Sequence, residues 1–118
     1  MKYTRQNIKG YRNIYIVTRT EITFQNCITV NENIFPFTLD DVWKRTKCLK
    51  DRSGWYFQQL VKLYAWKYID NILDKYLVID CDTFFLRPVD FVKDGKCLYN
   101  TGTEYHQPYF NHLKKLYS

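Results

Sequence analysis

The stretch YLVIDCDTFFLRPVDF, Tyr76 to Phe91, decides the fold of this chain. It opens with four apolar residues, continues into the pair Asp80 and Asp82, and is then interrupted by Arg87-Pro88. The apolar run predicts a buried strand from Tyr76 to Ile79. Residues two apart in a strand point to the same face, so the two carboxylates converge if the extended conformation persists through them.

A long helix is expected just before this strand. Trp55 to Ile69 has one broad apolar side, and Ser53 is its expected cap. The other expected elements are strands at Asn13 to Thr18, Cys27 to Val30 and Lys96 to Tyr99, and helices at Leu39 to about Lys47, capped by Thr38, and at Pro108 to Tyr117. This alternation predicts an α/β layered domain, and 118 residues fit a single one.

Composition excludes several classes of protein. With 46% hydrophobic and 25% charged residues, the chain is typical of a globular domain. No apolar stretch approaches the ~20 residues that cross a bilayer, so no membrane span is expected. The N-terminus lacks the apolar core of a secretory signal, which predicts a cytoplasmic location. The four cysteines are scattered and predict neither zinc sites nor disulfides.

The net charge of +6 raises the question of an anionic partner. The basic residues are spread along the whole chain without a basic block or a recognised motif, so a nucleic-acid partner is disfavoured. A generally basic, solvated surface explains the charge more simply.

The aspartate pair suits phosphate chemistry. Two carboxylates are hard oxygen ligands that favour Mg²⁺ or Mn²⁺, and such a cation shares its coordination with substrate phosphates. Haloacid-dehalogenase-like phosphatases carry Thr or Val two positions beyond their second aspartate, but here that position is Phe84. An isolated Asp-x-Asp is a weak motif, and two solvated aspartates remain the alternative.

Three runs together carry a resemblance to a known family: GWYFQQLVKLYAWKYI (Gly54 to Ile69), YLVIDCDTFFLRPVDF, and LYNTGTEYHQPYF (Leu98 to Phe110). They resemble a glycosyltransferase-like family of bacteria and giant DNA viruses, near the GT-A-type nucleotide-diphospho-sugar transferases. The resemblance implies a Rossmann-like GT-A-type sheet with flanking helices, a UDP- or GDP-sugar donor and an unknown acceptor. It implies that Asp80 faces the ribose or the metal and that Asp82 ligates Mn²⁺ or Mg²⁺. A viral member would work in the host cytoplasm.

Two further groups of residues are candidates for the site. Gln58 and Gln59 could reach the sugar or phosphate, although solvation of the helix explains them as well. Glu104, Tyr105 and His106 could grip an acceptor or supply a base, and a surface loop is the alternative.

The resemblance also implies a partial domain over residues 1–118. Family members carry a first strand and most of a helix before the strand at Asn13, and they continue beyond a segment like Pro108 to Tyr117. The missing strand would be central, so its absence leaves unpaired backbone edges and predicts weak or absent transferase activity. A non-catalytic remnant or binding module of the same fold is therefore the alternative function, followed by a basic nucleic-acid-binding domain.

Overall fold

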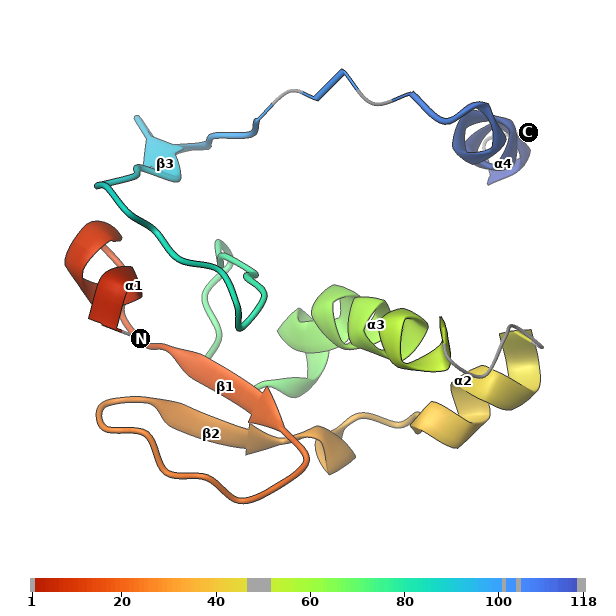
Figure 1. The fold of residues 1–118 in the computed structure, drawn as a ribbon, viewed down its shortest axis with the longest axis horizontal. Coiled ribbons are helices and arrows are strands. Elements are labelled where there is room, and N and C mark those ends of the chain that lie inside the picture. Colours follow the sequence, from red (N-terminus) through yellow and green to blue (C-terminus); the bar gives the residue numbers. More distant parts are fainter. Residues whose placement is uncertain (1, 47–51, 101, 104, 117–118) are drawn as a thin grey trace.

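A computed structural model describes residues 2–46, 52–100, 102–103 and 105–116 of the chain. The elements are, in order, α1 (Lys2–Asn7), β1 (Tyr15–Thr18), β2 (Ile28–Asn31), the 3-10 helix η1 (Glu32–Ile34), α2 (Leu39–Thr46), α3 (Ser53–Tyr68), β3 (Val92–Lys93), β4 (Lys96–Cys97) and α4 (Gln107–Leu116). Figure 1 shows α3 lying beside the β1–β2 pair, with α4 standing apart at the other end of the chain. Mixed α/β structure is therefore confirmed.

Two small sheets form within the described residues. β1 and β2 run parallel, with Tyr15 opposite Ile28 and Thr18 opposite Asn31, and residues 19–27 join them. β3 and β4 form an antiparallel hairpin around Asp94 and Gly95, both of which have positive φ. Each sheet has two strands, and the single open sheet expected from the sequence is not assembled in this part of the chain.

The core lies between α3, the β1–β2 pair and the segment after η1. Phe35, Ala65 and Ile69 are its buried members. Half-buried side chains packed around them come from both strands, from α3 and from nearby segments: Tyr15, Val17, Val30, Phe37, Val61, Tyr68 and Ile72. Ring contacts from Phe35 to Phe37 and Tyr68, with centroids 5.6 and 5.8 Å apart, join the helix to the segment after η1.

The helix α2 begins with the capping arrangement that its sequence predicts. The Asp41 amide donates to Thr38 Oγ1 at 3.2 Å, and the Thr38 amide donates back to Asp41 Oδ2 at 2.8 Å. These reciprocal bonds satisfy amides that the first turn leaves unpaired. They lower the pKa of Asp41, with the side-chain hydrogen bond from Thr38 as the largest cause. The Thr38 cap is therefore confirmed.

The N-terminal helix α1 is hydrogen-bonded to the 84–91 segment, which is distant along the chain. The buried Asn7 side-chain amide donates to the Phe85 carbonyl, and the Val89 amide donates to the Asn7 carbonyl at 3.0 Å. Ile8 and Val89 form an isolated parallel bridge beside these bonds. The rest of the 84–91 segment is irregular, as the Arg87-Pro88 break predicts.

Several details of the expected elements are wrong. The strand expected at Asn13 begins at Tyr15. Residues 76–79 form no strand and remain irregular and exposed. The strand expected at Cys27 begins one residue later, and the one expected to reach Tyr99 ends at Cys97. Ser53 is the buried first residue of α3 rather than its cap, since Arg52 holds the cap position without a side-chain bond.

The chain is more open than its length predicts. Its Cα radius of gyration is 16.7 Å, whereas about 13.5 Å is typical of a domain of this length. Its accessible surface is 10513 Å², whereas about 6,800 Å² is expected from its mass. The chain thus exposes roughly 3,700 Å² more surface than a compact domain of the same mass. Among the described helices, none has the length and apolar character needed to cross a membrane.

Candidate functional site

An ion pair links the first aspartate of the motif to the long helix. Lys62 Nζ lies 2.6 Å from Asp80 Oδ1. The Lys62 side chain is 25% exposed and the Asp80 side chain 51%, so the pair sits at the surface with its cation the more enclosed partner. The contact holds the segment that follows Tyr76 against α3, eighteen residues away along the chain.

The second aspartate follows on a turn rather than on an extended strand. The Thr83 amide donates to the Asp80 carbonyl at 3.1 Å, which closes a turn through Cys81 and Asp82. The extended conformation that would bring the two carboxylates to one face therefore does not persist through them. Asp82 is exposed, and no ion pair occupies it among the described residues.

The two candidate glutamines lie near this ion pair along the helix. Gln58 and Gln59 precede Lys62 by four and three residues, so each lies one helical turn before the residue that pairs with Asp80. Gln59 is half-buried and Gln58 is exposed. The helix thus brings an ammonium group and two amides to the neighbourhood of the aspartate motif.

The expected acceptor residues belong to a different part of the molecule. The Tyr105 ring stacks on Phe110 with centroids 4.7 Å apart, and the His106 ring meets Tyr109 edge to face at 4.6 Å. Both rings thus pack against residues of α4, the helix that follows them, and α4 stands apart from the 76–82 segment in Figure 1. Glu104 lies outside the described residues. The structure does not bring Tyr105 and His106 together with Asp80.

Asp80 and Asp82 are the candidate cation ligands of this region. In the described ranges, no three His, Cys, Asp or Glu side chains gather as a metal site. Asp80 and Asp82 offer hard carboxylate oxygens, which suit Mg²⁺ or Mn²⁺ when phosphate oxygens and water complete the coordination. Lys62 already holds one oxygen of Asp80, so Asp82 is the freer ligand.

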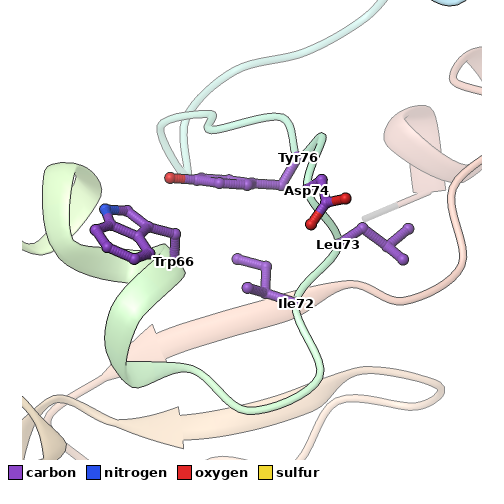
Figure 2. Close-up of a pocket in the computed structure, with 5 residues that line it drawn as sticks. All are labelled: Trp66, Ile72, Leu73, Asp74 and Tyr76. Carbon is purple, nitrogen blue, oxygen red and sulfur yellow. The ribbon is translucent and has the colours of Figure 1, made fainter.

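A hollow of about 340 Å³ opens one helical turn beyond Lys62. Figure 2 shows Trp66 from α3 on one side, and Tyr76 with Asp74 on the other, above Ile72. Leu73 completes its lining, and Asp74 is its single charged residue. The 72–80 segment runs alongside α3 in the opposite direction. Trp66 and Tyr76 therefore line the same hollow, one helical turn from the Lys62–Asp80 pair.

A second, shallower hollow of about 600 Å³ lies between β2 and the end of α3. Two polar groups on its rim bond to the chain itself. The Tyr15 hydroxyl donates to the Asn71 carbonyl at 3.0 Å, and the Arg12 guanidinium donates to the same oxygen.

Lys62 was not among the site residues predicted from the sequence, and its contact with Asp80 was missed. Its ion pair is a long-range contact, and no local pattern reveals it. The available signal was the helical spacing from Gln58 and Gln59, which puts Lys62 near both candidates on the helix surface.

Comparison with known proteins gives one match. The sequence model of a family of unknown function, DUF6492, matches residues 8–118. No curated protein and no solved structure matches the chain.

Proposed function

We propose that this chain, which belongs to the family of unknown function DUF6492, is a glycosyltransferase-like protein with a GT-A-type architecture. It would take a sugar from a nucleotide-diphosphate donor such as a UDP- or GDP-sugar and place it on an acceptor. The bond from the anomeric carbon to the diphosphate oxygen breaks, and a bond to an acceptor oxygen replaces it.

One observation carries this proposal: the ion pair of Lys62 with Asp80, next to the exposed Asp82. A diphosphate leaving group needs positive charge close to its oxygens as the bond breaks. Lys62 supplies an ammonium group, and the two carboxylates can hold a divalent cation. The resemblance of the surrounding runs to a glycosyltransferase-like family supports the same chemistry.

Each residue has a distinct role in this proposal. Asp82 would be the main ligand of Mn²⁺ or Mg²⁺, and Asp80 would share the cation or contact the ribose. Lys62 would turn from Asp80 toward a phosphate when the donor binds, since a lysine is a mobile point charge. Gln58 and Gln59 would donate amide hydrogens to the sugar or phosphate. When bound, the cation offsets the negative charge of the diphosphate.

A non-catalytic binding module of the same fold is the second candidate, and a specific observation favours it. The residues before Asp80 do not form the strand that would fix the two carboxylates. Catalytic groups work when the surrounding structure holds them in place, and a loosely held pair binds more readily than it catalyses.

Calorimetry with UDP- and GDP-sugars, with and without Mn²⁺, tests the proposal. We expect metal-dependent binding by the unmodified chain, a loss of at least about tenfold in affinity in Asp82→Ala, and no loss in Asp90→Ala. Asp90 is a matched control because it is an exposed aspartate on the same loop.

The same experiment separates the alternatives. Binding without sugar turnover favours the binding module. No metal-dependent nucleotide binding by either protein would overturn the proposal, and salt-sensitive binding to RNA or DNA would point to the basic nucleic-acid-binding alternative.

A further inference from the structure

The hollow beside the end of α3 has aromatic rings on two of its sides. Figure 2 shows Trp66 on one side and Tyr76 on the other, with Ile72 beneath them. Within the described residues, neither ring packs against another aromatic ring. The volume of about 340 Å³ lies within the range of about 300–1,000 Å³ that is typical of small-molecule sites. The two rings are therefore free to contact a small ligand.

Asp74 gives this hollow a negative charge. It is the single charged residue of the lining, and Figure 2 shows its side chain next to Tyr76. In the part of the chain that the structure describes, the Asp74 carboxylate forms no ion pair. The face of an aromatic ring also carries a negative potential. Carboxylate and rings together therefore favour a positively charged ligand.

The lysines nearest to this hollow in the sequence are bound elsewhere. Lys62 and Lys67 lie on either side of Trp66 along α3, and Lys75 precedes Tyr76. Each ammonium group contacts a different partner: Lys62 the Asp80 carboxylate, Lys67 the Tyr68 ring and Lys75 the Gly95 carbonyl. None of these three lysines therefore neutralises Asp74, and a cation from outside the chain can do so.

The lining selects one class of cation. Divalent metal ions take six or more oxygen ligands, and this hollow offers one carboxylate. A primary ammonium group brings three N–H donors that need acceptors. A quaternary ammonium group has no donors, and its methyl groups pack against aromatic faces while its charge attracts them. Ile72 and Leu73 add aliphatic contacts for the same methyl groups.

We propose that the hollow binds the quaternary ammonium group of a choline-like molecule. Trp66 and Tyr76 contact the methyl groups, and Asp74 balances the charge. This site goes beyond the proposed function and does not rest on it, because it uses neither Asp80 nor Asp82. The chain has a net charge of +6, so long-range electrostatics does not draw a cation to it. The affinity must come from the contacts inside the hollow.

A titration with choline and with its neutral isostere, in which carbon replaces the nitrogen, tests the proposal. Saturation transfer in nuclear magnetic resonance detects binding through the methyl protons of either ligand. The two ligands have the same shape, so a difference between them reports the charge alone. We expect the chain to bind choline at least about fivefold more tightly than the isostere, because two exposed rings and a carboxylate favour the cation.

Two substitutions remove the recognising groups one at a time. Trp66→Leu keeps an apolar wall without its π face, and Asp74→Asn keeps the shape without its charge. Each should lower the affinity for choline at least about threefold. Both side chains are exposed, so the far-ultraviolet circular dichroism should stay unchanged. Trp55→Leu and Asp90→Asn are the matched controls, since both residues are exposed and lie outside the hollow, and they should leave the affinity unchanged.

Phosphatidylcholine vesicles distinguish a lipid headgroup from a free ligand. Vesicle binding that choline displaces and that Trp66→Leu abolishes assigns the hollow to the headgroup, whereas choline binding without vesicle binding assigns it to a free molecule. Either result supports the quaternary ammonium site. The proposal would be overturned by equal affinity for choline and its isostere, or by no binding to choline and vesicles alike. Binding that Trp66→Leu and Asp74→Asn weaken no more than the two controls would overturn it as well.

Discussion

Lys62 Nζ lies 2.6 Å from Asp80 Oδ1, so the candidate metal ligand already carries a cation supplied by the chain itself. This pair is partly exposed, and such pairs contribute little to stability, about 0–1 kcal/mol. The pair matters because Lys62 competes with a metal ion for the Asp80 carboxylate. A divalent cation must share Asp80 with the ammonium group or displace it, and a phosphate can draw the ammonium group away.

The first prediction follows from this competition. Lys62→Met should raise the affinity for Mn²⁺ alone a few-fold, because it frees Asp80 from a pair of about 0–1 kcal/mol. The same change should lower the affinity for a UDP- or GDP-sugar with Mn²⁺, because the phosphates lose a positive partner. Electron paramagnetic resonance titration of Mn²⁺ and calorimetry of the nucleotide measure the two effects.

Lys67→Met is the matched control for this change. Lys67 lies on the same helix, and its ammonium group sits over the Tyr68 ring at 5.6 Å, away from Asp80. Its replacement should leave both affinities unchanged. Equal effects of the two substitutions, or a fall in the affinity for Mn²⁺ alone in Lys62→Met, would contradict the competition.

The sequence predicted those elements that depend on local chemistry. The helix α2 follows from the Thr38–Asp41 cap, and the apolar spacing of α3 predicted its length to within two residues at either end. The strand β1 follows from a β-branched and aromatic run. The cap of α2 and the helical spacing of α3 are local features, whereas β1 also depends on its pairing with β2.

Non-local partners explain what the sequence did not predict. Tyr76 to Ile79 has the composition of a strand, but a strand forms only when another strand accepts its hydrogen bonds. Within the described residues no such strand is available to it. The contact between Lys62 and Asp80 was missed for a similar reason, because it depends on how the chain returns past α3.

The second prediction concerns the core. Phe35 is 4% exposed and touches both Phe37 and Tyr68. Phe35→Ala should lower the free energy of unfolding by about 3–5 kcal/mol, a large share of the stability of an ordinary domain. Urea denaturation followed by circular dichroism measures the loss.

Phe84→Ala provides the control for the core substitution, since Phe84 is 64% exposed. It should change the unfolding free energy by no more than about 0.5 kcal/mol. If the two alanine variants were equally stable, the assignment of the core to Phe35 and its neighbours would be wrong.

The third prediction concerns the link between α1 and the 84–91 segment. Asn7 is buried, and its side-chain amide donates to the Phe85 carbonyl. Asn7→Leu keeps a similar volume but leaves that carbonyl without its donor, a cost of about 1–3 kcal/mol. The Val89 amide, which bonds the Asn7 carbonyl, should then exchange its hydrogen faster.

Asn13→Leu is the control for the Asn7 change, because Asn13 is exposed and, among the described residues, its side chain donates to the Tyr15 hydroxyl at 3.3 Å. The rate of hydrogen exchange at the Val89 amide should be the same in Asn13→Leu as in the unmodified chain. Unchanged exchange at Val89 in Asn7→Leu would mean that the loop is held by other contacts.

The fourth prediction concerns acid and the first turn of α2. The hydrogen bonds from Thr38 hold the pKa of Asp41 below its ordinary value of 3.8. A carboxyl whose pKa is lowered by folding stabilises the fold fully above its unfolded pKa, and that contribution disappears as pH falls through the lowered value. Carboxyl chemical shifts in nuclear magnetic resonance should therefore give a titration midpoint for Asp41 below pH 3.8.

Thr38→Val keeps the shape of the side chain but removes the hydroxyl donor, and it should move the midpoint of Asp41 up toward 3.8. A midpoint at or above 3.8 in the unmodified chain, or one that Thr38→Val leaves in place, would show that the reciprocal cap does not hold α2 in solution.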